Sequence, residues 1–447
     1  MKSIFTFLCS VWMTISFAQD FAAYRINDPE IGSFTAADFT GDQFVDIIAI
    51  EFELNSEASI HLYTNKKEST IAFTGKKLFT KIPFSGRPAS GDLDGDGDVD
   101  VVYNNPMDKT LTALINDGTG NFTQMLLNVP GSTRILVYDL DKDGDYDIVG
   151  STKNPNSLHV YINNGGLSFT ATNIYNLTEA PEAIDIADFD GDGDEDILVG
   201  VSDRFNTQVF MYQNNGGGSY TSQGIAINGF NTLYNIYASD VNKDGKKDIV
   251  VLTDSDVKIL ENQGSMTFVE KLLSTGDDRL FTGAQVVDLT GEGQPDIVLG
   301  SFEGMRWYKN LSLSDYSYEK GIMNGVNAAY HIVSVDLNND EAKDVITANG
   351  SLWWYQNKIT QLPSGTKNET LQTISIYPNP VSDEINIEEL SDKIYFLTVI
   401  NGVGQEVLKT ILDYGKANVK SLSSGQYLVV VQDESGKKVG QQIILKQ

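Results

Sequence analysis

The aspartate residues of this sequence gather in short loops of a kind that could bind a metal ion. A nine-residue acidic loop occurs seven times, and consecutive loops begin 47 to 54 residues apart. Carboxylates at alternate positions of such a loop can converge on one point. Ca²⁺ prefers six to eight oxygen ligands, drawn from carboxylates, backbone carbonyls and water. The loops are DFTGDQFVD (38–46), DLDGDGDVD (92–100), DLDKDGDYD (139–147), DFDGDGDED (188–196), DVNKDGKKD (240–248), DLTGEGQPD (288–296) and DLNNDEAKD (336–344).

Four of the loops match the requirements of a calcium site closely. Positions 1, 3, 5 and 9 would supply side-chain oxygens, position 7 a backbone carbonyl, and a glycine at position 6 would permit the sharp turn. Asn242 replaces an aspartate in one of these loops, but its amide oxygen is also a ligand. The predicted ligands are Asp92, Asp94, Asp96, Asp98, Asp100, Asp139, Asp141, Asp143, Asp145, Asp147, Asp188, Asp190, Asp192, Asp194, Asp196, Asp240, Asn242, Asp244, Lys246 and Asp248.

The other three loops depart from this pattern. Thr40 and Thr290 take the place of an acid, and Gln43 and Glu341 take the place of the glycine. We expect weaker calcium binding there, or loops held by hydrogen bonds without an ion. Solvated turns without metal are the alternative for all the loops, but carboxylates crowded without a counter-charge repel one another. The predicted ligands of these three are Asp38, Asp42, Asp46, Asp288, Glu292, Asp296, Asp336, Asn338, Asp340 and Asp344.

Each acidic loop belongs to a repeated unit of four predicted strands. An apolar run precedes the loop, a second run follows it, and a third ends in Tyr or Leu with an Asn two residues later. A glycine-rich turn and a fourth run complete the unit. Four short strands per unit, repeated without helical periodicity, are typical of β-propeller blades. The asparagine column is Asn65, Asn116, Asn163, Asn214, Asn262, Asn310 and Asn357.

The sequence therefore predicts an all-β protein in which residues 19–357 form a seven-bladed β-propeller. No fourth strand follows Asn357, whereas residues 21–27 resemble the fourth strands of the other units. We expect this N-terminal segment to complete the last blade, which removes an open sheet edge. Six blades with an unrelated seventh loop are the alternative.

The pattern D-x-D-x-D-G-x-x-D, placed between the first two strands of each unit, resembles the FG-GAP/VCBS repeats of integrin-α-type propellers. The resemblance covers about residues 20–357. It implies that the loops bind calcium structurally on one face, and that ligand contacts lie on the opposite face. The departures at loops 38–46, 288–296 and 336–344 leave open whether those loops hold calcium.

Residues 1–18 are expected to be a secretory signal peptide, because Lys2 precedes an apolar stretch too short to span a bilayer. A membrane anchor is the alternative. Cys9 is the single cysteine and lies in this segment, so the mature chain would have no disulfide, and bound metal could stabilise it instead. The net charge of −29 argues against nucleic acid and anionic membranes as partners. We expect a monomer without a transmembrane segment after signal removal.

The C-terminal part of the chain has a different character. Residues 358–372 are polar and are predicted to be a linker, and residues 373–447 contain short β-type runs that predict a small β-sandwich. The motif Tyr377-Pro-Asn-Pro-Val381, the later runs and the terminal Lys446 resemble the C-terminal sorting domain of type IX secretion cargo. This resemblance implies type IX secretion machinery as a partner and an outer-membrane surface or secreted location. A generic carbohydrate-binding sandwich is the alternative.

A ligand site is predicted at the mouth of the propeller channel, on the face away from the acidic loops. The residues five positions before each loop would ring this mouth, and they include polar side chains that packing does not require. These side chains could bind a glycan or a surface protein, although solvated channel residues are an equal alternative. The candidate residues are Arg87, Arg134, Asn235, His331, Tyr234 and Tyr330.

The sequence contains no standard catalytic or nucleotide-binding motif, and with three His residues few nucleophile–base pairs are available. A calcium-binding adhesion module is therefore the predicted function. One catalytic alternative is a uronate lyase that uses Tyr330 and His331 as base candidates, with Arg87 and Arg134 neutralising the substrate carboxylate. A structural surface protein is the other alternative.

Overall fold

The computed structural model consists of two compact units, Met1–Ser364 and Gly365–Gln447. Its described residues are all in strands, turns or irregular structure, and among them no helix is long and apolar enough to cross a membrane. The expected signal peptide lies outside the described residues. The structure describes residues 21–26, 30–52, 58–67, 73–177, 179–202, 207–227, 232–253, 256–273, 281–301, 304–312, 317–323, 329, 331–348, 350–359, 376–378, 380–387, 395–401, 406–412, 415–433 and 438–446.

The described part of the first unit contains seven antiparallel sheets of four strands each. Six of them use strands that are consecutive in the chain. They are β2 (Ile31–Ala37), β3 (Asp46–Phe52), β4 (Ala58–Asn65) and β5 (Phe73–Ile82); β6 (Ser85–Gly91), β7 (Asp100–Asn105), β8 (Thr110–Asn116) and β9 (Phe122–Pro130); β10 (Arg134–Tyr138), β11 (Asp147–Lys153), β12 (Asn156–Asn163) and β13 (Phe169–Asn176); β14 (Pro181–Ala187), β15 (Asp196–Ser202), β16 (Thr207–Asn214) and β17 (Tyr220–Ile225); β18 (Leu233–Ser239), β19 (Asp248–Thr253), β20 (Val257–Asn262) and β21 (Phe268–Leu273); β22 (Phe281–Val287), β23 (Asp296–Ser301), β24 (Gly304–Ser312) and β25 (Ser317–Met323).

The seventh sheet joins the two ends of this unit. It contains β26 (His331–Val335), β27 (Asp344–Ala348), β28 (Leu352–Asn357) and, as its fourth strand, β1 (Phe21–Arg25). Strands β1 and β28 are antiparallel, with Phe21 opposite Asn357. The expectation that the N-terminal segment completes the last sheet is confirmed.

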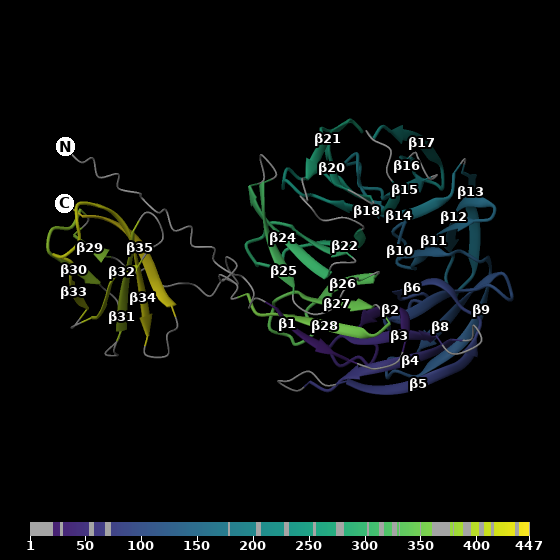
Figure 1. Ribbon diagram of the computed structural model, residues 1–447, viewed down its shortest axis with the longest axis horizontal. Helices are drawn as coiled ribbons and strands as arrows, with labels where there is room; N and C mark the ends of the chain where they lie inside the picture. The colour runs from purple at the N-terminus through teal and green to yellow at the C-terminus, as the bar shows by residue number, and fades with distance from the viewer. Residues whose placement is uncertain are drawn as a thin grey trace, which may run out of the picture. The chain divides into compact units, whose positions relative to one another are not determined.

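The sheets are arranged around a common centre, as in a propeller (Figure 1). The first strand of each sheet contacts the first strand of the next, from β2 through β6, β10, β14, β18 and β22 to β26, and β26 contacts β2 again. This closed circuit places the seven first strands innermost. The sheets therefore present their edges to the centre and their faces to one another.

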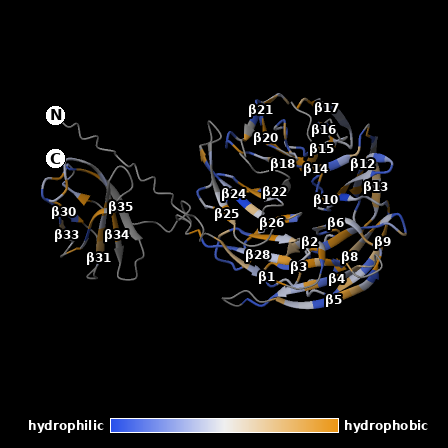
Figure 2. Cartoon of the chain, in the orientation of Figure 1, coloured by the Kyte–Doolittle hydropathy of each residue, from blue (hydrophilic) through white to orange (hydrophobic). Residues whose placement is uncertain are grey.

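Apolar side chains fill the spaces between neighbouring sheets. One cluster combines Val250 and Ile259 of one sheet with Ala284 and Leu299 of the next. The second strands are buried on both faces, and every residue of β7, β15, β19 and β23 is buried. Figure 2 shows this apolar character along the strands. Continuous apolar runs, instead of an alternating pattern, are what such a position requires.

A repeated pair of side chains, which we call the Asp–Asn latch, holds each acidic loop to its sheet. In one sheet, Asp147 at loop position 9 accepts the backbone N–H of Leu140 at 2.8 Å and that of Asn163 at 2.7 Å. The Asn163 side-chain amide then donates to the carbonyl of Tyr146 at 3.1 Å and to that of Leu93, in the preceding loop, at 2.8 Å. The latch therefore joins two strands of one sheet and reaches the next sheet.

The same latch recurs around the ring. The Asn side chain reaches the preceding loop at Asn65, Asn116, Asn163, Asn262, Asn310 and Asn357. Asn65 is the closing case, because its amide donates to the carbonyl of Leu337 at 2.8 Å and so links the first loop to the last. The sequence column of asparagines thus has a structural cause.

The C-terminal unit consists of two antiparallel sheets that share one apolar core. Residues of both sheets, including Ile385 and Val399, are fully buried in this core. One sheet contains β29 (Ile376–Tyr377), β30 (Glu384–Ile387) and β33 (Lys416–Asn418); the other contains β32 (Glu406–Ile411), β31 (Tyr395–Asn401), β34 (Gly425–Asp433) and β35 (Lys438–Lys446).

The latch predicts the effect of a single substitution. Asn163→Ala removes the two hydrogen bonds that its amide donates and the one that its amide oxygen accepts from the N–H of Gly165. It leaves two carbonyls without that donor, so we expect the free energy of unfolding in urea to fall by about 2 kcal/mol. Asn164→Ala is the control, because Asn164 is exposed and water can replace its bonds. Equal losses for the two variants would contradict the role assigned to the latch.

Candidate functional site

The acidic loops lie together because each one connects the first and second strands of its sheet. Loop 92–100, for example, joins β6 to β7, and loop 139–147 joins β10 to β11. Since the innermost strands are equivalent around the ring, their loops emerge at the same end. The sheets therefore place every acidic loop on one face of the unit and leave the other face to the connections between sheets.

The aspartates also shape the backbone of their own loops. Asp92 at position 1 accepts the N–H groups of Gly95 and Gly97, both at 2.8 Å, and Asp96 at position 5 accepts that of Asp98 at 2.9 Å. Gly97 has a positive φ of 94°, which a glycine adopts without strain. The carboxylates are thus held in fixed orientations before any ion arrives.

Three of the loops bring carboxylate oxygens close enough to share a cation. In each loop, three ligand atoms lie within 4.8 Å of one another, in the groups Asp92, Asp94 and Asp96; Asp139, Asp141 and Asp147; and Asp188, Asp190 and Asp196. Burial and then the neighbouring acids raise the pKa of Asp94 and of Asp141. Three hard oxygen donors with unfavourable mutual repulsion fit Ca²⁺ well.

The aspartate at position 9 is the most deeply placed carboxylate of each loop. Asp147 and its equivalents are fully buried, and burial raises the pKa of Asp147 to about 6 and that of Asp344 to about 7. Both oxygens of Asp147 already accept backbone N–H groups in the latch. This residue therefore has a structural task that does not depend on an ion.

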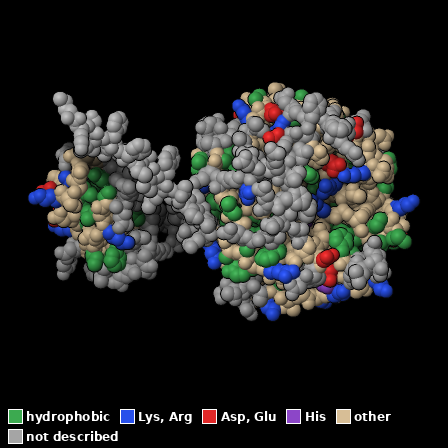
Figure 3. Space-filling view, in the orientation of Figure 1, with side chains coloured by type: hydrophobic (Ala, Val, Ile, Leu, Met, Phe, Trp, Pro, Cys, Tyr) green, Lys and Arg blue, Asp and Glu red, His purple; other side chains and the backbone are tan. Residues whose placement is uncertain are grey.

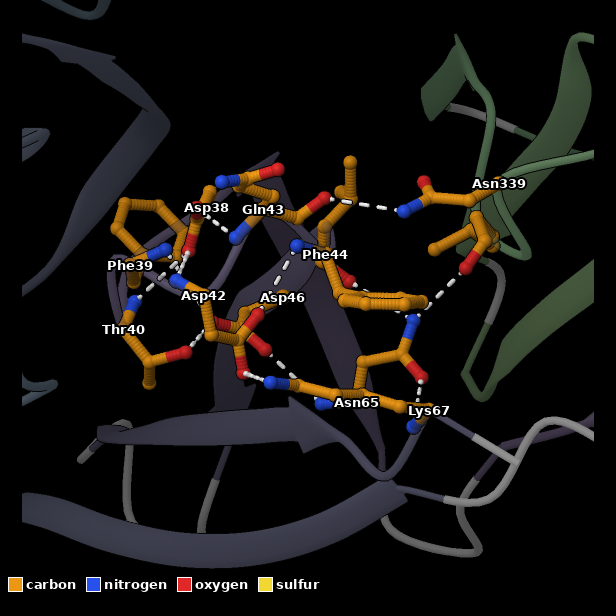
Figure 4. Close-up of polar contacts among 12 residues, drawn as sticks. Asp38, Phe39, Thr40, Asp42, Gln43, Phe44, Asp46, Asn65, Lys67 and Asn339 are labelled. Atoms are coloured by element: carbon orange, nitrogen blue, oxygen red, sulfur yellow. Dashed lines mark hydrogen bonds and ion pairs between the residues drawn. The ribbon is translucent and has the colours of Figure 1, made fainter. Parts of the chain in front are cut away.

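A lysine takes a place beside the acids in two of the loops that depart from the pattern. The ammonium of Lys67 lies 3.1 Å from Asp42 and 5.3 Å from the centre of the Phe44 ring (Figure 4). Burial raises the pKa of Asp42, but the N–H of Phe44 and then Lys67 lower it more. In loop 288–296, Lys309 lies 2.5 Å from Glu292.

The two remaining loops are intermediate. In loop 240–248, Lys246 pairs with Asp244 at 2.7 Å, but the lysine side chain is 42% exposed and is free to turn away. In loop 336–344, the amide of Asn338 donates to Asp340 at 2.8 Å. Glu341 occupies the glycine position with φ at 71°, a conformation that costs a residue with a side chain some strain.

A cavity of about 290 Å³ lies between the innermost strands, and it contains four of the six residues predicted for a ligand site. These are Arg87, Arg134, Asn235 and His331. Tyr234 instead packs against the apolar cluster between two sheets, because adjacent residues of a strand point in opposite directions. Tyr330 lies outside the described residues.

Three polar residues that the sequence analysis missed also line this cavity: Asp185, Tyr237 and Gln285. Each stands three positions before its loop, two residues after the column that was predicted to ring the channel mouth. Because side chains repeat their direction every second residue of a strand, this second column was available as a signal. Asp185 accepts the N–H of Ala238 at 2.7 Å, and the Tyr237 hydroxyl accepts the N–H of Ala284 at 3.2 Å.

The cavity is electrically unusual for so acidic a protein. Burial, followed by the charge of Arg134, lowers the pKa of Arg87 to about 10, and burial also lowers the pKa of Arg134. Burial and then both arginines hold the pKa of His331 well below its usual value, so this imidazole is neutral at pH 7. The two arginines thus lie close enough to repel each other, and their charges keep His331 neutral.

The two roles of the loop aspartates predict different mutant behaviour. Asp147→Ala removes two buried acceptors, so we expect a loss of about 3 kcal/mol in unfolding free energy even with a calcium chelator present. Asp141→Ala changes an exposed residue, so we expect a change below about 0.5 kcal/mol in chelator and a clear loss only in calcium. Urea denaturation in both buffers separates the two, and equal behaviour of the variants would refute the distinction.

Family models match both units of the chain. The FG-GAP-like repeat matches residues 38–103, 92–150, 139–199, 188–251 and 240–299. The secretion system C-terminal sorting domain matches residues 375–446. No curated protein matches the chain.

Two solved structures illustrate the similarity in fold. A lectin of Agrocybe aegerita, described as recognising non-reducing terminal N-acetylglucosamine, has 20% identity and a TM-score of 0.50, over 70% of this chain and 87% of the lectin. PorZ of Porphyromonas gingivalis, a bacterial surface component of the type IX secretion system, has 15% identity and a TM-score of 0.44. The match covers 90% of this chain but only 58% of PorZ. At this identity, the likeness to the lectin concerns the fold alone.

The repeat matches together run from residue 38 to residue 299, which is more than half of the chain, and the sorting-domain match occupies the C-terminal unit. The protein belongs to the FG-GAP-like repeat family, and its sorting domain directs export by type IX secretion to the cell surface or the extracellular space.

Proposed function

We propose that this protein is a calcium-stabilised, seven-bladed β-propeller that works outside the cell as a binding module for glycan or protein ligands. The observation that carries the proposal is the polar cavity between the innermost strands, in a protein exported to the cell surface or beyond. Its ligand groups lie toward the start of the first strands, whereas the acidic loops follow the ends of those strands. Ligand and calcium would therefore occupy opposite sides of the ring.

The acidic loops serve this function indirectly, as structural calcium sites. Loops 92–100, 139–147 and 188–196 have three converging carboxylates each, and loop 240–248 keeps its glycine and an amide ligand. In loops 38–46 and 288–296 a lysine already balances part of the acidic charge. We assign calcium to loops 92–100, 139–147, 188–196 and 240–248. The other three loops lack a full ligand set and are held by hydrogen bonds.

The two ends of the chain direct its export from the cell. Residues 1–18 act as a signal peptide for the inner membrane, and residues 373–447 form a β-sandwich that the type IX machinery recognises. The shared core of the two C-terminal sheets supports an independently folded unit. The mature protein is then a monomeric propeller that is released or held at the outer surface.

Charged side chains of both signs occur on the face drawn in Figure 3. In Figure 3, basic and acidic side chains of the described residues are scattered over the visible face and form no large patch of one sign. A macromolecular partner that bound by long-range electrostatic attraction would need such a patch.

Calcium should raise the stability of the full mature chain. A single site saturated at one hundred times its dissociation constant contributes about 2.7 kcal/mol, so several sites should raise the melting temperature by many degrees. Magnesium is the control, because it dehydrates reluctantly and needs stricter geometry. We expect four calcium ions per chain by titration calorimetry; a melting temperature that is the same in calcium and chelator would disprove the calcium assignment.

The binding function is tested by a glycan array and a panel of extracellular proteins, probed with the calcium-loaded chain. We expect saturable binding to a small set of ligands, lost when a chelator destabilises the ring. If the folded, calcium-loaded chain binds none of them, the result would favour a structural role at the cell surface. New unsaturated sugar products, detected by ultraviolet absorbance, would favour a lyase.

A further inference from the structure

Three basic side chains converge in the central cavity from different sheets. Arg87 comes from β6, Arg134 from β10 and His331 from β26. All three side chains line the same cavity. The charge of Arg134 lowers the pKa of Arg87, and the charges of both arginines lower the pKa of His331. The folded protein therefore tolerates a repulsive arrangement at its centre.

The acidic residues nearby do not neutralise Arg134. Arg134 forms no ion pair with any residue that the structure describes. Glu182 acts on it only at a distance, and its carboxylate is already bound to Lys153 at 2.6 Å. Asp185 lines the same cavity, but it accepts the N–H groups of Ala238 and Ile186. In a chain with 61 acidic and 32 basic residues, a half-buried arginine that lines a cavity without an acidic partner indicates a counter-charge that comes from a ligand.

The histidine provides a second and independent sign of a ligand. Its Nδ1 is buried and has no hydrogen-bond partner. The ring packs against Phe34, with the ring centres 4.5 Å apart, so its position is fixed. A buried polar atom without a partner is costly, and a ligand oxygen or hydroxyl would relieve that cost.

The chemistry of the cavity favours an acidic sugar. A guanidinium binds a carboxylate through two parallel hydrogen bonds, and the planar fork of arginine fits that group closely. The amides of Asn235 and Gln285 and the phenol of Tyr237 also line the cavity. These polar groups can form hydrogen bonds with sugar hydroxyls. Ile332 and Val333 contribute an apolar part of the cavity wall. The volume of about 290 Å³ lies near the lower limit for ligand sites and fits one sugar residue.

We propose that the central cavity binds the carboxylate of an acidic sugar residue, with Arg134 and Arg87 holding the carboxylate and His331 contacting a neighbouring oxygen. This inference rests on the proposed binding function and names its ligand class. The cavity would bind the terminal sugar of a glycan chain or a single exposed sugar residue, because it is too small to hold several sugars.

The experiment uses the full mature chain in calcium and titration calorimetry with trigalacturonate. We expect binding that weakens at least tenfold in Arg134→Gln, and less severely in Arg134→Lys, which keeps the charge but loses the fork. The methyl-esterified trisaccharide, which lacks the charges, should not bind. Lys271→Gln is the matched control, because it removes one positive charge outside the cavity, where Lys271 lies 3.6 Å from Glu261.

The outcomes separate this inference from the broader proposal. Equal binding of the methyl ester, or unchanged affinity in Arg134→Gln with an unchanged melting temperature, would overturn the carboxylate site. Binding of inorganic phosphate or an aspartate-rich peptide, but not of trigalacturonate, would overturn the assignment to an acidic sugar, and so would no binding of any of the three. If a glycan array then still shows calcium-dependent binding that Arg134→Gln retains, the binding module stands and only the cavity assignment falls.

Discussion

The Asp–Asn latch is the interaction on which the rest of this ring depends. One buried carboxylate fixes the start of its loop and the end of the third strand, while the asparagine amide ties that sheet to the loop of the preceding sheet. A propeller has few hydrogen bonds between blades, since its sheets meet face to face through apolar side chains. The latch supplies a directional bond at these junctions, and at Asn65 it joins the first loop to the last.

The latch also explains how an acidic loop can keep its shape in several chemical forms. The position-9 aspartate is satisfied by backbone N–H groups whether or not an ion is present, so the outer carboxylates can vary. Asp94 and Asp96 converge with Asp92, whereas loop 38–46 has a threonine and a lysine contact instead. The proposed calcium would thus be an addition to a loop that the sheet already holds, and we expect that loss of a ligand in one unit would not open the ring.

The distribution of charge divides the molecule into two kinds of site. Carboxylates gather where the first strands end, and half-buried basic side chains gather toward the start of the same strands. Each gathering is unfavourable by itself, and each points to an external partner of opposite charge. Neither site requires the ring to move, because both are built on innermost strands that are packed on each side.

The sequence by itself determined the repeat, the all-β class, the loops and the N-terminal strand that pairs with β28, because these follow from local patterns that recur in every unit. It also found four of the cavity residues, since one strand position recurs at a fixed distance from each loop. It misjudged Tyr234, whose neighbour Asn235 faces the cavity while Tyr234 faces the core. It also missed Asp185, Tyr237 and Gln285.

Only the tertiary structure decided which groups come together across units. The contact of Lys67 with Asp42, the reach of Asn163 to Leu93 and the meeting of Arg87, Arg134 and His331 join residues from separate strands or sheets. A repeat pattern fixes the position of each residue within its own unit. The distance between side chains of different units depends on how the ring closes and packs, and that packing is a property of the whole chain.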